Sequence, residues 1–136
     1  MATEAVILVV EDNEDNLRLV EYLLSAHGYA PLLARNGADA VRMAVEARPN
    51  LILLDIRMPG MDGYEVAAVI RHTPGLERTR IVAVTASAMV GDRERIAAAG
   101  FDGYIRKPID PETFIRTIGR FIPVRSATRD YALGEA

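Results

Sequence analysis

Continuous apolar runs alternate along the chain with segments whose apolar residues recur at helical spacing. Three runs contain no polar residue: Ala5–Val10, Leu51–Leu54 and Ile81–Val84. Short runs of this kind are typical of strands that are buried on both faces. Two weaker strands are predicted over Pro31–Ala34 and Gly103–Ile105. The leading proline of one of them suits an edge strand, where no ladder partner needs the missing N–H.

Five helix-like segments fill the intervals between these runs. Their ends carry start and stop signals. Asp62 precedes the third segment as an N-cap, Gly100 follows the fourth, and Pro111 occupies the first helical position of the fifth. The predicted helices cover Asn13–His27, Gly37–Ala47, Gly63–His72, Ala88–Ala99 and Asp110–Phe121.

Regular alternation of strands and helices predicts an α/β fold, a single (βα)5 domain with a five-stranded parallel sheet and helices on both faces. The three strong strands should be central and the two weak ones should be edges, which fits the doubly wound order 2-1-3-4-5. We expect residues 1–122 to form this domain. Residues 123–136 show no periodicity and are expected to be a flexible tail.

The composition narrows the possible functions. The net charge is −3 and the basic residues are scattered along the sequence, so nucleic-acid binding is not expected. There is no cysteine, which excludes disulfides and thiolate metal sites. Neither a signal peptide nor an apolar run long enough to span a bilayer is present. A cytoplasmic protein is therefore expected, without a membrane partner.

Polar residues follow the predicted strands directly, where doubly wound sheets bind ligands. Glu11 and Asp12 follow the first strand, Asp55 the third, Thr85 the fourth and Lys107 the fifth. Clustered carboxylates repel one another, and oxygen ligands favour Mg²⁺, with Mn²⁺ also possible. The hydroxyl and the ammonium suit phosphoryl oxygens, and an aspartate can itself accept a phosphoryl group. Asp55 is the candidate because it ends the central strand.

Each of these residues also has a simpler explanation. Asp12 could only cap the first helix, Thr85 could only bond to backbone at a strand end, and Lys107 could be a solvated lysine. Taken singly, these explanations are preferable. Taken together, they require coincidences at four successive positions on one edge of the sheet, so the joint functional interpretation is favoured.

The motifs at these positions resemble those of response-regulator receiver domains, similar to the single-domain chemotaxis and cell-cycle regulators of bacteria. The resemblance extends over Ala5–Ile122 and implies a flavodoxin-like fold. It rests on four segments in order: Val6–Asn16, Leu51–Gly63, Ile81–Met89 and Gly103–Ile109.

The resemblance implies a role for each position. Asp55 would accept the phosphoryl group. Asp12 would ligate Mg²⁺ directly, Glu11 mainly through water, and Arg57 through its backbone carbonyl. Thr85 and Lys107 would contact the phosphoryl oxygens, with Thr85 moving on activation. Tyr104 would be the aromatic residue that moves with Thr85, although it could simply pack on the edge strand. Pro108 would follow a cis peptide bond.

The implied function is that of a phosphoacceptor in a two-component His–Asp phosphorelay, not an enzyme acting on external substrates. A sensor histidine kinase or a histidine phosphotransfer protein would donate the phosphoryl group. The switch would act on the face formed by the helix of 88–99, the strand of 103–105 and the helix of 110–121, which would contact a downstream protein. Arg57 and Ser87 occupy the two positions that tune phosphate lifetime in the family, so slow to moderate autodephosphorylation is expected. Either a monomer or a weak phosphorylation-dependent dimer is compatible.

Three alternative functions have to be compared with the residues at these positions. A phosphatase of the haloacid-dehalogenase type needs a second aspartate where Arg57 stands. A flavodoxin-type binder needs a phosphate-cradling loop where Glu11 and Asp12 would repel phosphate. A pseudo-receiver that only scaffolds partners remains open, although no site residue is missing. With no output domain after the predicted receiver, the output is expected to pass through protein contacts.

Overall fold

The computed structural model describes residues 5–122, and the predicted tail of 123–136 lies outside them. Five parallel strands form one sheet in the order β2-β1-β3-β4-β5, as predicted. The strands are β1 (Ile7–Val10), β2 (Leu32–Ala34), β3 (Leu51–Asp55), β4 (Arg80–Thr85) and β5 (Gly103–Arg106). The two weak apolar runs are the edge strands β2 and β5, which confirms the ordering by hydrophobicity.

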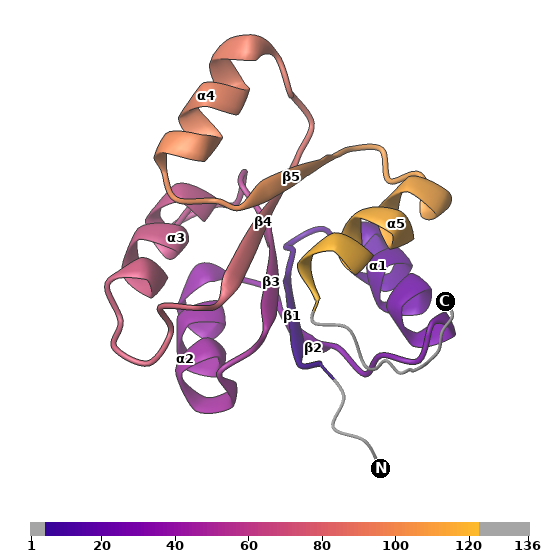
Figure 1. Cartoon of the computed structure of the whole chain (residues 1–136), viewed down its shortest axis with the longest axis horizontal. Helices are drawn as coiled ribbons and strands as arrows, with labels where there is room; N and C mark the ends of the chain where they lie inside the picture. Colours follow the sequence, from indigo (N-terminus) through magenta and orange to yellow (C-terminus); the bar gives the residue numbers. More distant parts are fainter. Residues whose placement is uncertain (1–4, 123–136) are drawn as a thin grey trace.

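Five helices cover the two faces of the sheet (Figure 1). α1 and α5 lie on one face, and α2, α3 and α4 on the other. The helices are α1 (Glu14–Ala26), α2 (Gly37–Ala47), α3 (Gly63–Arg71), α4 (Val90–Ala98) and α5 (Pro111–Phe121). Within residues 5–122, no helix is both long and apolar enough to cross a membrane.

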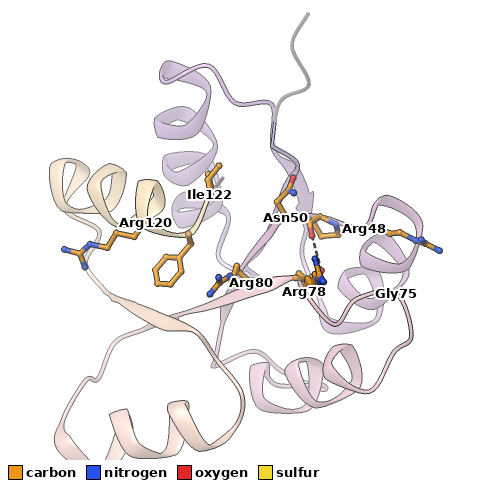
Figure 2. Close-up of a pocket in the computed structure, with 10 residues that line it drawn as sticks. Arg48, Asn50, Gly75, Arg78, Arg80, Arg120 and Ile122 are labelled. Atoms are coloured by element: carbon orange, nitrogen blue, oxygen red, sulfur yellow. Dashed lines mark hydrogen bonds between the residues drawn. The ribbon is translucent and has the colours of Figure 1, made fainter. Parts of the chain in front are cut away.

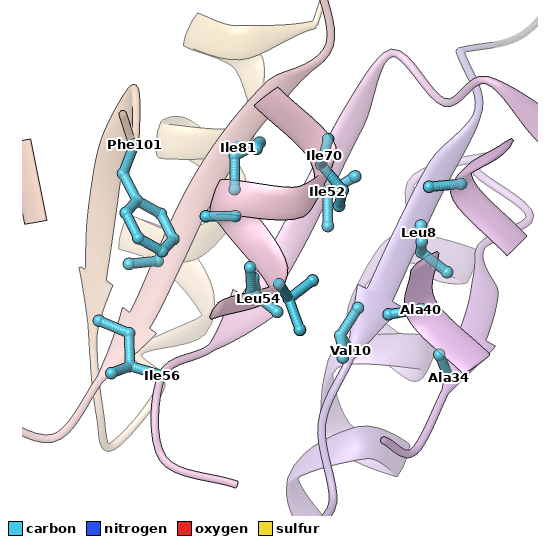
Figure 3. Packing of buried hydrophobic residues seen from close by; sticks show 14 of the residues in the cluster. Leu8, Val10, Ala34, Ala40, Ile52, Leu54, Ile56, Ile70, Ile81 and Phe101 are labelled. Atoms are coloured by element: carbon cyan, nitrogen blue, oxygen red, sulfur yellow. The ribbon is translucent and has the colours of Figure 1, made fainter. Parts of the chain in front are cut away.

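Two apolar clusters hold these layers together, one on each side of the sheet. Alternate residues of each central strand point to opposite faces, so Leu8 and Ile52 belong to one cluster while Ile7 and Leu51 belong to the other. Figure 3 shows the first cluster, where Ile70 of α3 lies over the strands. Burial of both strand faces explains why these runs lack polar residues.

The observed helix ends lie within two residues of those predicted from the sequence. Asp62 caps α3 in a reciprocal pair with Glu65, and Asp110 caps α5 ahead of Pro111. α4 begins two residues later than predicted, because Met89 has extended backbone angles and acts as the N-cap. Its side chain offers no acceptor to the first turn of α4.

Candidate functional site

The predicted site residues meet at the carboxyl edge of the sheet. β1 and β3 pair in parallel register and end side by side, so the residues that follow them are neighbours. Ligand atoms from the carboxylates of Glu11, Asp12 and Asp55 all lie within 4.8 Å of one another. Glu11 and Asp55 are buried, whereas Asp12 is exposed. The crowding of acidic groups expected from the sequence is therefore present.

Lys107 points into this acidic cluster. Its Nζ lies 3.4 Å from Oδ1 of Asp55 and 3.2 Å from Oε1 of Glu11. The peptide bond between Lys107 and Pro108 is cis, as the family resemblance implied. The backbone N–H of Lys107 also donates to the carbonyl of Thr85 at 2.8 Å, which ties the lysine to the end of β4. Lys107 is thus an ion-pairing group of the site, and its interpretation as a solvated lysine is wrong.

Asp55 is electrostatically strained by its surroundings. Burial in the site, together with the hydrogen bond and the negative charge of Glu11, raises the pKa of Asp55 to about 6. The charge of Lys107 and the backbone N–H of Arg57, which donates to Asp55 Oδ1 at 3.2 Å, act in the opposite direction. A divalent cation or a phosphoryl group would change this balance of charges.

The cluster fits a magnesium ion by the chemistry of its donors. Its groups supply only oxygen, which hard divalent cations prefer, and the exposed carboxylate leaves one side open to water. Repulsion between the Glu11 and Asp55 carboxylates would be relieved by a cation shared between them. Asp12 is free for this role because Asn13, not Asp12, caps α1 through its bond to the N–H of Asn16 at 2.9 Å.

Thr85 ends β4 with a buried side chain. Its hydroxyl donates to the carbonyl of Ser87 at 2.9 Å and accepts from the Ser87 N–H at 3.1 Å. The hydroxyl therefore bonds to backbone here, as the simpler explanation had it. Ser87 in turn donates its own hydroxyl to Asp92 in the first turn of α4. A chain of hydrogen bonds thus links the end of β4 to α4.

Sequence reasoning did not find Asp92, because its link to Thr85 depends on the path of the loop and not on a motif. It also did not explain Gly63. A Cβ on Gly63 would lie 2.6 Å from Cα of Ile56 and 2.7 Å from the carbonyl oxygen of Asp55. Only glycine lets the start of α3 approach the end of β3 this closely. Arg35 and Asn36, which follow β2, stay outside the cluster, where Arg35 pairs with Glu14 at 3.0 Å and Asn36 caps α2.

A five-stranded parallel sheet in the order 2-1-3-4-5, with carboxylates after β1 and at the end of β3 that pair with a lysine after β5, is typical of phosphoryl-accepting signalling domains. The chain belongs to the response regulator receiver domain family, whose model matches residues 7–119. It is a receiver domain in two-component signalling and not a classical enzyme.

Several relatives are similar to it. The polar-differentiation response regulator DivK of Brucella anthropi is 43% identical over 116 residues, which are 85% of this chain and 94% of that protein. The chemotaxis response regulator CheY4 of Vibrio cholerae has a TM-score of 0.83 at 30% identity, covering 88% of this chain and 99% of that one. The receiver domain of a sensor histidine kinase from Pseudomonas aeruginosa has a TM-score of 0.80 at 38% identity, covering 88% of this chain and 98% of its own. That structure has a magnesium ion coordinated in its active-site cleft.

Proposed function

We propose that Asp55 is the phosphoacceptor of a Mg²⁺-dependent response regulator. The observation that carries the proposal is the convergence of a buried Asp55, two further carboxylates and the Lys107 ammonium within one cluster. The donor is a phosphohistidine on a sensor histidine kinase or a histidine phosphotransfer protein, and acetyl phosphate can replace it in vitro. Such partners are cytoplasmic, so we place the protein there as well.

In the transfer, an Asp55 carboxylate oxygen forms a P–O bond while the P–N bond of the phosphohistidine breaks. The imidazole leaves with the electron pair of the P–N bond on its freed nitrogen, which then takes up a proton from solvent. Lys107 is near enough to Asp55 to pair with an equatorial oxygen of the phosphoryl group. Glu11, Asp12, Asp55 and the backbone carbonyl of Arg57 would hold Mg²⁺, which supplies charge neutralisation of the phosphoryl oxygens.

Phosphorylation then competes for the Thr85 hydroxyl, which is bonded to Ser87 in the unphosphorylated chain. In the proposed switch the hydroxyl turns to a phosphoryl oxygen and loosens the bonds that lead through Ser87 to Asp92 and α4. Tyr104 of β5, half-buried against the cluster under α4, follows into the vacated space. The equilibrium between the conformations of the α4–β5–α5 face shifts accordingly. In the proposed function, that face controls a downstream protein partner.

Labelling with acetyl phosphate tests the phosphoacceptor. The wild type is expected to incorporate one phosphoryl group with Mg²⁺ and none with excess EDTA, measured by intact-protein mass spectrometry. Asp55→Asn should abolish incorporation, while Asp39→Asn, which removes an exposed carboxylate of α2, should leave it unchanged. Equal labelling of the wild type and Asp55→Asn would refute the site, and an unlabelled wild type would indicate a pseudo-receiver.

The lifetime of the phosphoryl group follows from two residues next to the site. Arg57 and Ser87 lack the acidic or amide groups that assist hydrolysis in fast-cycling receivers, so autodephosphorylation is slow to moderate. Loss of label from the purified phosphoprotein measures this rate. A half-life of seconds would contradict the expectation.

A further inference from the structure

A concave surface lies at the end of the sheet where the strands begin, opposite to the end that carries Asp55. It is a groove of about 430 Å³, bounded by the segments that lead into β3 and β4 and by the end of α5. Because the strands are parallel, their starts are at the other end of the molecule from the carboxyl cluster. We call this surface the arginine groove, after the four arginines that line it: Arg48, Arg78, Arg80 and Arg120.

Acidic groups compensate the four guanidinium groups only in part. The charge of Arg48 contributes to the lowered pKa of the nearby Glu77 carboxyl, so Arg48 has an acidic neighbour. Within residues 5–122, Arg78 and Arg120 take part in no ion pair or side-chain hydrogen bond. Arg80 comes only to 3.8 Å of Asp102, whose other carboxylate oxygen is bonded by Arg71 at 2.8 Å. The net charge of the chain is −3, so a groove that contains arginines without acidic partners differs in charge from the molecule as a whole.

The arginines are spread along the groove and do not converge on one point. Figure 2 shows Arg120 at one end and Arg48 at the other, with Arg78 and Arg80 between them. Convergent guanidiniums would suit a single phosphate group, whereas a row of them suits an extended ligand that carries several negative charges. The geometry therefore favours an extended anion.

The groove also offers neutral contacts. Phe121 and Ile122 from the end of α5 and Pro49 provide apolar surface. The side-chain oxygen of Asn50 accepts from the Val6 N–H at 2.7 Å, which leaves its NH₂ able to donate to a ligand. A partner with both acidic and apolar side chains could use these contacts together.

We propose that the arginine groove binds an acidic segment of a partner protein, in which Asp or Glu carboxylates pair with the arginines and an apolar side chain packs on Phe121. A short acidic segment meets only the groove, whereas a long nucleic acid would also meet the net negative surface of the rest of the chain. Sequence analysis missed the site because its arginines belong to separate segments that only the fold brings together. The proposal does not depend on phosphorylation of Asp55, since the two sites are at opposite ends of the sheet.

The test is a titration of the full ¹⁵N-labelled chain with a ten-residue peptide of glutamates around one central phenylalanine, followed by amide chemical shifts. Shifts are expected at groove residues such as Gly75, Thr79 and Arg120. Arg78→Glu with Arg120→Glu should weaken binding about tenfold or more, as expected for the loss of several charge-assisted contacts. Both substitutions are on the surface, so labelling of Asp55 by acetyl phosphate should be unchanged.

The matched control is Arg93→Glu with Arg116→Glu, two exposed arginines of α4 and α5 outside the groove. Both double variants move the net charge from −3 to −7, since each replaces two positive by two negative side chains. The control should weaken binding less than about twofold if the groove is the site, because remote charges are screened by salt. Equal weakening by both variants, or no groove shifts at millimolar peptide, would overturn the proposal. Tighter binding of single-stranded DNA than of the peptide, lost in the groove variant alone, would also overturn the proposal. It would indicate that the groove binds a nucleic acid and not an acidic protein segment.

Discussion

At the scale of single residues, burial and neighbouring charge disfavour the ionised form of the central carboxyl, so its ionisation lowers the stability of the folded state. Asp55 is buried beside Glu11, and this raises its pKa to about 6 from the ordinary value of 3.8. Lys107 compensates only in part. A bound cation would reduce the repulsion between Glu11 and Asp55 and so lower the pKa of Asp55. The protonation state of Asp55 therefore depends on whether a cation is bound.

This raised pKa predicts a pH-dependent gain in stability for Asp55→Asn in metal-free buffer. Since the folded state holds the Asp55 proton more tightly than the unfolded state, the stability of the wild type falls as pH rises from about 4 to about 6. The variant escapes that loss, and above pH 6 it should be more stable by about 1 kcal/mol, a value discounted for solvent screening. Urea unfolding at several pH values in EDTA measures the difference.

The control for this prediction is Asp39→Asn, whose carboxylate is exposed on α2. It should show no such pH-dependent gain. Added Mg²⁺ should stabilise the wild type and reverse the order of the wild type and Asp55→Asn. A wild type that gains stability between pH 4 and pH 6 relative to Asp55→Asn would contradict the assigned pKa.

At the scale of elements, the junction between β3 and α3 fixes the position of Asp55. Gly63 begins α3 with its N–H bonded to the carbonyl of Ile56 at 2.9 Å. A side chain on Gly63 would overlap backbone atoms of Asp55 and Ile56, which cannot move aside as a flexible side chain could.

Gly63→Ala is therefore expected to destabilise the protein by about 2–4 kcal/mol and to slow labelling of Asp55, because the overlap displaces the end of β3. Gly119→Ala in α5 is the matched control. A Cβ there meets nothing within 4 Å, so alanine should stabilise the helix by about 0.5–1 kcal/mol. Thermal unfolding and acetyl phosphate labelling report both effects. Equal stability of the two variants would show that the junction can relax.

α4 is the least anchored helix by its sequence and its contacts. Ile96 is its one buried residue, and Met89 at its N-cap accepts no hydrogen bond through its side chain. The first turn is held instead by the bond between Ser87 and Asp92. A weakly held helix beside Thr85 is well suited to change position when the site is phosphorylated.

Met89→Ser should strengthen α4 by about 0.5–1 kcal/mol, since a serine hydroxyl at the N-cap accepts from the first turn. Slower hydrogen exchange of the α4 amides is the expected readout. Met89→Ala removes the same exposed apolar side chain without supplying an acceptor, so its α4 amides should exchange as in the wild type or faster. The same slowing in both variants would show that capping is not the cause.

At the scale of the whole molecule, stability comes from two apolar clusters that sandwich the sheet. Phe114 of α5 is fully buried against the second cluster, and Ile118 lies one turn further along the same stripe. α5 belongs both to this core and to the proposed output face, so its position is set by packing on the sheet.

Phe114→Ala should lower the free energy of unfolding by about 3–5 kcal/mol, through lost burial and the cavity that remains. Val45→Ala on α2, where the side chain is 48% exposed, should change it by about 0.5 kcal/mol or less. Urea unfolding monitored by circular dichroism compares the two. A loss of similar size at both positions would mean that α5 does not pack as described.

The amino-acid sequence by itself determined the order of elements, the edge strands and the identity of the carboxyl cluster. Burial on both faces removes polar residues from the central strands, and parallel pairing forces their ends together, so both facts can be read from hydrophobic runs and the residues after them. Glu11, Asp55 and Lys107 were predictable for this reason.

Only the tertiary structure decided the features that depend on contacts between distant segments. The bond of Thr85 to the backbone of Ser87, the close approach at Gly63 and the grouping of four arginines at the opposite end of the sheet follow from loop paths and helix docking. No periodicity marks them, because side chains from separate elements become neighbours only when the sheet and its helices pack.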